Sequence, residues 1–290
     1  DYDFILKNCE SASRIYHIPK VLYHWRIHPA SVAGDPESKS YAYEAAVRAL
    51  QNHLARTGSS GTVTRDSSFG YYRINYSYPP NATVSVCLIG CATDLENEIR
   101  STVPSSVTVN FVSDLNTVAD EYVLVLYKVK KILNSNWLEP MLGNCTRKET
   151  GLVSGRICYK KDRVLECGLL FTPDGRLHSP FYQFHTSDFG YCRRAQTQHN
   201  CSFIGPHFFM AKASTIKKYT SCASVRELID HIYELSLKLT KDNLLITVLP
   251  QISVLCTEKH LSLPQIEECR GKQDPYYNPN FSKTKIYHLS

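Results

Sequence analysis

The sequence predicts an α/β fold in which helices flank a mainly parallel β-sheet, and three observations support this class. Strand-sized apolar runs recur at residues 84–89, 107–112 and 122–127, and the last of them is almost wholly apolar, as in a central parallel strand. Helical segments are interspersed with such runs, and strands that alternate with helices form a sheet covered by helices. Apolar residues make up 43% of the 290-residue chain and charged residues 21%, as in an ordinary globular protein with a sizeable core.

The amino-terminal part carries two helical patterns. Residues 1–10 place a short apolar run between polar ends, which predicts a short helix. Residues 15–22 alternate in character and predict an irregular strand. Residues 40–56 form an amphipathic pattern that Gly58 ends, as a glycine after the last helical turn commonly does.

Residues 59–80 differ in composition from their surroundings. They are rich in serine, glycine and threonine, then in tyrosine, and they end in a proline pair, which predicts a linker. A new unit is expected after this linker. Beyond the three apolar runs it should contain a helix from residue 136, a strand at 151–159, a strand or hairpin at 202–211, a helix at 225–239 and a strand at 244–249.

Charge and cysteine usage narrow the function classes. The formal charge of +6 is compatible with anionic nucleotide sugars, lipid phosphates or a membrane surface, and ordinary solubility explains it equally well. No basic run is dense enough to predict nucleic-acid binding. The eleven cysteines are scattered without paired spacing, which favours buried thiols in a reducing cytosol over a zinc site. No apolar run approaches the roughly 20 residues of a membrane-spanning helix.

The opening of the chain carries a specific motif. Residues 1–33 read DYDFILKNCESASRIYHIPKVLYHWRIHPASVA, with an acidic pair before a helix, then HIPKVLYHWR, then a histidine and a serine. This segment resembles the last part of family-two glycosyltransferase domains of the GT-A fold, in bacterial double-domain members. Because the chain starts without methionine and inside the motif, we expect it to be a piece of a longer parent protein.

Features of a second such domain follow. Residues 78–89 resemble its first strand, residues 119–126 the strand that leads to the metal motif, and the run DPYYNPNF at 274–281 the tail of such proteins. The resemblance implies a GT-A-like, Rossmann-like second copy that is degenerate, preceded by the end of a first copy. The implied parts are the end of a first glycosyltransferase domain at 1–58, a linker at 59–80, a degenerate second domain at 81–260 and a C-terminal tail at 261–290.

The resemblance also implies the activity of the parent. Such an enzyme transfers a sugar, here a hexosyl or deoxyhexosyl group, from a nucleotide-diphosphate sugar with inversion. The acceptor would be a cell-surface polysaccharide or a lipid-linked glycan, and Mg²⁺ or Mn²⁺ would be the cofactor. The implied location is the cytoplasm, with peripheral contact at the inner face of the plasma membrane as an alternative.

The candidate catalytic base is an aspartate near the start of the chain. Within the resemblance Asp1 matches the base that removes the proton of the acceptor hydroxyl, and Asp3 is the alternative. The non-catalytic alternative is that the carboxylate only stabilises the N-terminus of a helix. His24, Arg26 and His28 alternate in an extended segment, so they would face one way, toward a diphosphate or its metal, or else form a polar rim.

The second domain departs from the family where catalysis requires a metal. Leu126 is followed by Tyr127-Lys128-Val129-Lys130-Lys131 where an Asp-x-Asp motif is expected. Two lysines replace the carboxylates, and a lysine cannot hold Mg²⁺ or Mn²⁺. No complete metal site is therefore expected in this chain, and no metal in the second domain. A phosphate could bind without metal to Lys128, Lys130, Lys131, Lys160 and Lys161, but we favour a solvated surface. Asp114 could contact a uridine or stabilise a turn, and we favour the turn.

Two functions follow from these observations. The parent protein would be a glycosyltransferase of polysaccharide biosynthesis. Alternatively, the second domain would be a catalytically dead scaffold that binds glycan or a partner domain. The chain taken alone is expected to be inactive, because no complete donor site is present.

Overall fold

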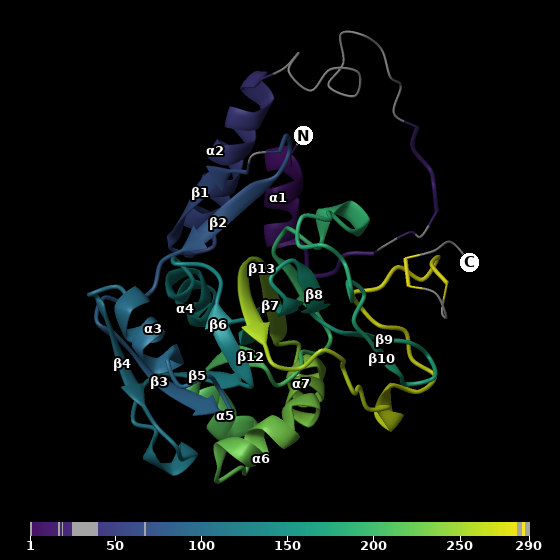
Figure 1. The fold of residues 1–290 in the computed structure, drawn as a ribbon. Helices are drawn as coiled ribbons and strands as arrows, with labels where there is room; N and C mark the ends of the chain where they lie inside the picture. The colour runs from purple at the N-terminus through teal and green to yellow at the C-terminus, as the bar shows by residue number, and fades with distance from the viewer. Residues whose placement is uncertain are drawn as a thin grey trace. The chain divides into compact units, whose positions relative to one another are not determined.

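A computed structural model describes residues 2–16, 18, 20–24, 40–66, 68–282 and 286–287 (Figure 1). The chain divides into two compact units, Asp1–Ser77 and Tyr78–Ser290. Each unit is described by itself. In the described residues, no helix combines the length and the apolar character that crossing a membrane requires.

The first unit contains two helices and a hairpin. The helices are α1 (Tyr2–Ser11) and α2 (Ser40–Arg56), where helices were predicted. Strands β1 (Gly61–Arg65) and β2 (Tyr72–Tyr76) pair antiparallel. The segment predicted to be a linker therefore carries a hairpin. Alternate residues of β2 are half-buried, so one face of this strand is partly covered. The strand expected at 15–22 is absent from the described residues of that range.

The second unit is built on one large mixed sheet in the order β11-β13-β7-β12-β5-β3-β4, with β6 on β13 and β8 on β7. Its strands are β3 (Ala82–Ile89), β4 (Val107–Phe111), β5 (Tyr122–Tyr127), β6 (Val129–Ile132), β7 (Thr150–Lys160), β8 (Arg163–Glu166), β11 (His199–Cys201), β12 (Phe208–Lys212) and β13 (Leu245–Cys256). Strands β9 (Leu170–Phe171) and β10 (Leu177–His178) form a separate hairpin.

Parallel pairing occurs in two blocks of the large sheet. Strand β3 pairs parallel with β4 and β5, and β7 pairs parallel with β13. Strand β12 lies between the blocks and runs antiparallel to both β5 and β7. The α/β class is thus confirmed, and the three apolar runs singled out in the sequence are β3, β4 and β5.

Helices cover both faces of this sheet (Figure 1). Helices α3 (Leu95–Thr102) and α4 (Leu138–Thr146) pack in one core with Leu124 and Leu126 of β5. Helices α5 (Ala213–Tyr219), α6 (Val225–Asp230) and α7 (Ile232–Lys241) pack in a second core with Val123 and Val125. Alternate residues of β5 therefore face opposite cores, and all six of its residues are buried.

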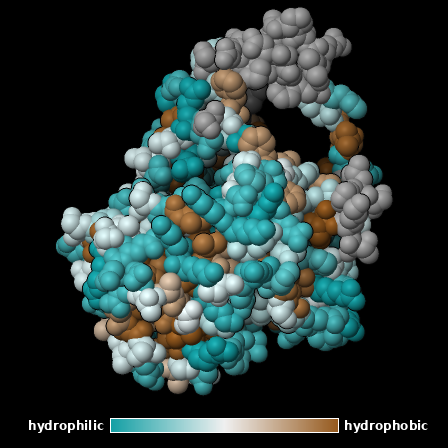
Figure 2. All heavy atoms as spheres, viewed as in Figure 1, coloured by the Kyte–Doolittle hydropathy of each residue, from teal (hydrophilic) through white to brown (hydrophobic). Residues whose placement is uncertain are grey.

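The surface of the molecule in the same view is mainly hydrophilic, and hydrophobic residues form small separate groups on it (Figure 2). Single exposed apolar residues are normal on a globular protein and indicate no interface by themselves.

The helix predicted at 225–239 is two helices. Ser224 and Glu227 form a reciprocal capping box at the start of α6. At His231 the backbone leaves helical geometry, with φ −103° and ψ 15°, and its ring nitrogen Nδ1 lies 2.8 Å from the carbonyl oxygen of Glu227. This local interaction ends α6, and α7 begins at the next residue.

The C-terminal residues belong to the core of the second unit. Asp274 is buried and accepts hydrogen bonds from the backbone of Phe171 at 2.9 Å and of Tyr276 at 2.8 Å. Tyr277 and Phe281 form a small apolar cluster with Leu170. The aspartate therefore holds the DPYYNPNF segment against β9.

Candidate functional site at the carboxyl end of the sheet

The topology selects one edge of the sheet for a site. Strand β3 lies between β4 and β5, so the chain leaves β3 toward one side and β5 toward the other. In open α/β sheets, ligands bind where such neighbouring connections diverge, outside the carboxyl ends of the strands. Gly90 follows β3 here and Lys128 follows β5, and the amide of Lys128 donates to the carbonyl of Ile89 at 2.8 Å.

Three side chains meet at this edge, and we call them the Glu258 cluster: Lys128, His207 and Glu258. The Lys128 ammonium lies 2.5 Å from Oε1 of Glu258, and Nε2 of His207 lies 2.9 Å from Oε2. Lys128 joins β5 to β6, His207 precedes β12 and Glu258 follows β13. One carboxylate thus connects three strands of the sheet.

The backbone fixes the three residues before their side chains meet. The amide of Tyr127 donates to the carbonyl of His207, and the amide of Thr257 donates to the carbonyl of Lys128, both at 2.8 Å. Lys128 has φ +55°, a left-handed conformation that is uncommon for a residue with a side chain. The tight turn between β5 and β6 requires it, and the turn sends the ammonium back toward Glu258.

Electrostatics make the cluster neutral. His207 is 2% exposed, and burial lowers its pKa, so its neutral ring donates from Nε2 to Glu258. Burial alone would raise the pKa of Glu258, but hydrogen bonds from Lys128 and His207 outweigh it and hold that pKa below its usual value. The hydrogen bond to Glu258 raises the pKa of Lys128. One ammonium therefore balances one carboxylate.

These residues do not fit a divalent metal. The cluster offers one carboxylate, which is already paired, and its ammonium stands where metal-binding carboxylates were expected from the resemblance. Nδ1 of His207 is buried and has no hydrogen-bond partner in the described part of the chain. Over the same residues, no group of three or more potential ligands from histidine, cysteine, aspartate and glutamate could hold a metal ion.

The neighbouring charges are also paired or exposed. Arg226 of α6 lies with its guanidinium 5.6 Å from the ring centre of Tyr127 and 3.3 Å from the carboxylate of Asp230. Lys130 and Lys131 are exposed on β6. Of the cations described at this edge, Lys128 and Arg226 are therefore paired with carboxylates, and Lys130 and Lys131 are solvated.

The residues predicted from the resemblance lie in the first unit. Asp1, Arg26 and His28 are outside the described residues, and His24 is exposed. Asp3 lies in the first turn of α1, 2.7 Å from the ammonium of Lys7 and 3.6 Å from the guanidinium of Arg56.

The hydrogen bond from Lys7 is the main cause that lowers the pKa of Asp3. A carboxylate whose pKa is lowered by an ion pair is a weaker base than an unpaired carboxylate. In this arrangement, Asp3 is better suited to stabilising the helix than to abstracting a proton.

Asp114 has the turn role that was favoured. Its carboxylate accepts a hydrogen bond from the backbone amide of Asn116 at 3.0 Å and caps the short helix Leu115–Thr117.

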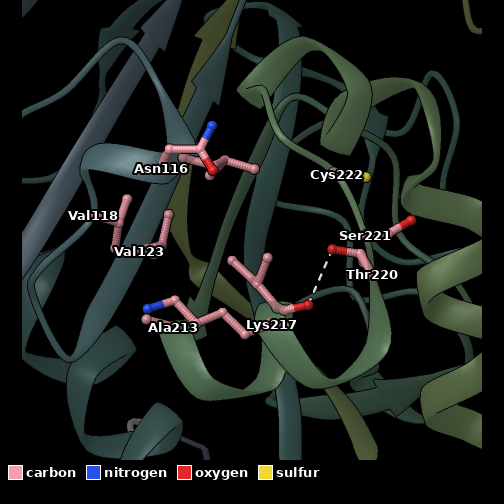
Figure 3. A pocket seen from close by; sticks show the side chains of 10 residues that line it. Asn116, Val118, Val123, Ala213, Lys217, Thr220, Ser221 and Cys222 are labelled. Carbon is pink, nitrogen blue, oxygen red and sulfur yellow. Dashed lines mark hydrogen bonds between the residues drawn. The ribbon is translucent and has the colours of Figure 1, made fainter.

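A cavity of about 280 Å³ lies beside the amino-terminal half of β5, at the other end of the strand from Lys128 (Figure 3). Its lining is Leu115, Asn116, Val118, Val123, Ala213, Ile216, Lys217, Thr220, Ser221 and Cys222. The hydroxyl of Thr220 is turned back onto the carbonyl of Ile216 at 3.0 Å. Asn116 donates to the carbonyl of Ala223 at 3.2 Å. These bonds hold the loop after α5 and add no convergent group for chemistry.

Sequence comparisons relate the chain to bacterial proteins. It is 39% identical over 109 residues to the uncharacterized protein y4gI of Sinorhizobium fredii, which covers 36% of this chain and 12% of that protein. It is 22% identical over 350 residues to the O-antigen biosynthesis protein RfbC of Myxococcus xanthus, which covers 98% of this chain and 27% of that protein. The chain therefore spans about a quarter or less of these relatives. No protein-family model matches it.

Among solved structures, the chain is similar to GalNAc-T7 crystallised with UDP, GalNAc and Mn²⁺. The similarity covers 80% of this chain and 54% of that chain, with a TM-score of 0.42 and 9% sequence identity.

The Glu258 cluster gives a stability prediction. Glu258→Gln should lower the free energy of unfolding at pH 7 by about 1 kcal/mol, because Lys128 loses its counter-charge but stays partly hydrated. The pKa of Glu258 is depressed in the fold, so its stabilisation is present above the unfolded pKa and lost as the pH falls. Urea unfolding should therefore show a smaller difference between variant and wild type at pH 4. Glu267→Gln, at an exposed surface pair, is the control.

Proposed function

We propose that Tyr78–Ser290 is a glycosyltransferase-like domain that performs no transfer itself and binds glycan or a partner domain within a longer transferase. One observation carries the proposal: at the carboxyl end of β5, Lys128 pairs with Glu258 where the resemblance expects metal-binding carboxylates. Similarity to an O-antigen biosynthesis protein along 98% of the chain supports a role in polysaccharide assembly.

The chemistry of the reaction explains why this domain would be inactive. Inverting sugar transfer needs a base for the acceptor hydroxyl and positive charge for the departing diphosphate. The Glu258 cluster is neutral, and its histidine is buried. A diphosphate at this edge would find neither a metal nor a free cation of the cluster.

The activity of the parent protein is part of the proposal. The parent would transfer a hexosyl or deoxyhexosyl group with inversion from a nucleotide-diphosphate sugar to a surface polysaccharide or lipid-linked glycan. Mg²⁺ or Mn²⁺ would act in its first domain, whose end is residues 1–58, with Asp1 or Asp3 as base and His24, Arg26 and His28 near the diphosphate. Residues 81–260 would be the degenerate copy and 261–290 its tail. The location would be the cytoplasm, with peripheral contact at the inner face of the plasma membrane as the alternative.

A direct assay tests the inactivity. The 290-residue chain, incubated with UDP-, GDP- and dTDP-sugars and Mn²⁺ or Mg²⁺, should release no nucleoside diphosphate above the protein-free rate. Lys128→Ala should behave as the wild type, because the lysine neutralises Glu258 and does not bind the nucleotide-sugar donor. A metal-dependent glycosyltransferase in the same assay is the positive control. Metal-dependent release above the protein-free rate would refute the proposal, and its loss in Lys128→Ala would assign the release to this edge.

A further inference from the structure

A second pocket adjoins the loop that carries Glu258. It has a volume of about 290 Å³. One wall comes from the β9–β10 hairpin and the segment that follows it, and the other wall comes from the loop after β13. Its lining is Leu177, His178, Ser179, Tyr182, His260, Leu261 and Leu263. His260 is two residues beyond Glu258, so one loop contributes to both places.

Among the described residues that line this pocket, none is acidic or basic apart from two histidines. Burial lowers the pKa of His178, so this ring is neutral at pH 7, and its Nε2 lies 3.1 Å from the hydroxyl of Thr172. His178, Ser179 and Tyr182 are half-buried and His260 is exposed, so a ligand would be partly desolvated here. The lining residues offer a charged group no fixed counter-charge, which favours an uncharged ligand.

Hydrogen-bonding groups from both segments line the pocket. The hydroxyl of Tyr182 lies 3.2 Å from Nδ1 of His260. The hydroxyl of Ser179 donates to the carbonyl of Leu165 at 3.0 Å, which leaves its oxygen able to accept. Each of these groups can exchange a hydrogen bond with a ligand hydroxyl.

Apolar groups complete the lining. Leu177 belongs to one apolar cluster, against which Leu263 packs, and Leu261 packs against the main core on the α3–α4 face. Apolar walls with a few convergent polar groups are the usual composition of a small-molecule site. A pyranose has hydroxyls at its edge and C–H groups on its faces, and it matches this combination.

The pocket wall is held in place by the hairpin turn. Gly175 has φ +83° in that turn and accepts a hydrogen bond from the amide of Ile266 at 2.8 Å. The side chain of Gln265 donates to the carbonyl of Asp174 at 2.6 Å. Because the hairpin turn and residues 265–266 are already hydrogen-bonded to one another, ligand binding would cost little conformational entropy.

We propose that this pocket binds one neutral sugar unit of a glycan chain. The inference rests on the proposed function, since it assigns the glycan-binding role of the second unit to particular residues. Tyr182 and His260 bind sugar hydroxyls, and the leucines contact a face of the ring.

Binding is measured by saturation-transfer NMR and by titration of the 290-residue chain with methyl glycosides of neutral hexoses and deoxyhexoses. At least one glycoside should bind saturably. Tyr182→Phe and His260→Ala should each weaken it about fivefold to tenfold, as expected for one lost hydrogen bond. Tyr191→Phe and His231→Ala, at residues outside the lining, are matched controls that should bind as the wild type. Far-UV circular dichroism checks that each variant is folded.

Three results would overturn the assignment: no saturable binding at the highest soluble concentration of any neutral glycoside, tighter binding of methyl uronates than of the neutral glycosides, or equal affinity in the wild type and both pocket variants. The transfer assay reports separately on the proposed function. Transfer that both pocket variants retain would overturn the inactivity of the domain. Absent transfer together with absent binding would overturn the pocket alone.

Discussion

Gly155→Ala should lower the free energy of unfolding by about 3 kcal/mol, through overpacking in the centre of the sheet. A Cβ at this position would lie 2.7 Å from the carbonyl oxygen of Ile252 and 2.8 Å from a ring carbon of Phe208. Phe208 is fully buried and the other neighbour is backbone, so neither can move without shifting β12 or β13. Urea unfolding monitored by circular dichroism measures the loss.

Gly151→Ala is the matched control because it lies on the same strand. Its added Cβ would meet only the side chain of Leu239, at 3.0 Å, and a leucine can change rotamer more easily than backbone can move. The cost at Gly151 should therefore be clearly smaller than the cost at Gly155. Equal losses of unfolding free energy in the two variants would mean that replacing any glycine of β7 has this cost, and that contact with Ile252 is not its cause.

The requirement for glycine at 155 originates in β13. The pairing of β13 with β7 shifts between Leu249 and Ser253, which is a bulge, and Pro250 within it cannot donate a backbone hydrogen bond. The bulge brings the carbonyl of Ile252 close to β7, so only a residue without a side chain fits opposite. Beyond the bulge, β13 continues to Cys256, two residues before Glu258. The bulge thus helps to set the position from which Glu258 reaches its partners.

Local sequence patterns were sufficient for the strands and insufficient for two other elements. The apolar runs predicted β3, β4 and β5 because a buried strand must be apolar along its length. The break at His231 escaped detection because Leu228, Ile232 and Leu235 keep helical spacing across it. Serine, glycine and threonine dominate the first part of residues 59–80, and this composition does not reveal the β1–β2 hairpin that the segment carries.

The site was predictable only in part. The position of Lys128 at the end of β5 could be predicted, because a lysine directly after a buried apolar strand is conspicuous in the sequence. Its partner Glu258 is 130 residues away, and His207 is 51 residues from Glu258. No periodicity or motif connects positions so far apart. Only the pairing of β12 with β5 and of β13 with β6 brings them to Lys128. The pocket at Tyr182 and His260 was missed for the same reason.

Glu166→Gln should remove a pH dependence of stability that the wild type shows between about pH 4.5 and 7. Glu166 ends β8 and is 1% exposed; its Oε1 accepts from the amide of Gly205 at 2.7 Å. Its Oε2 is buried without a hydrogen-bond partner in the described residues. Burial raises the pKa of this carboxyl from 4.5 to about 7.

The sign follows from proton binding in the two states. Between pH 4.5 and 7 the unfolded chain has released this proton while the folded chain keeps it, so stability falls as the pH rises. A raised pKa of this size corresponds to about 3 kcal/mol lost above pH 7 relative to pH 4. The glutamine is uncharged at every pH and keeps an oxygen that can accept from Gly205.

Urea unfolding of both proteins at intervals from pH 4 to pH 8 measures this linkage, with the variant gaining stability relative to wild type as the pH rises. The other titratable groups that interact with Glu166 are Tyr233, Cys167 and Cys201, and Asp274 lies near them. Both proteins carry these groups, so their contributions largely cancel in the difference. Parallel curves would show that Glu166 keeps an ordinary pKa.

The pH dependence extends to the candidate site through the backbone. Gly205, which donates to Glu166, is two residues before His207, and a Cβ on Gly205 would lie 2.2 Å from Oε2 of Glu166. Ionisation of Glu166 therefore places an uncompensated charge against the segment that positions His207. The same pH series, followed by the histidine NMR signals of the folded protein, should show His207 responding near pH 7 in the wild type and not in Glu166→Gln. A response retained in the variant would assign it to His207 itself or to Glu258.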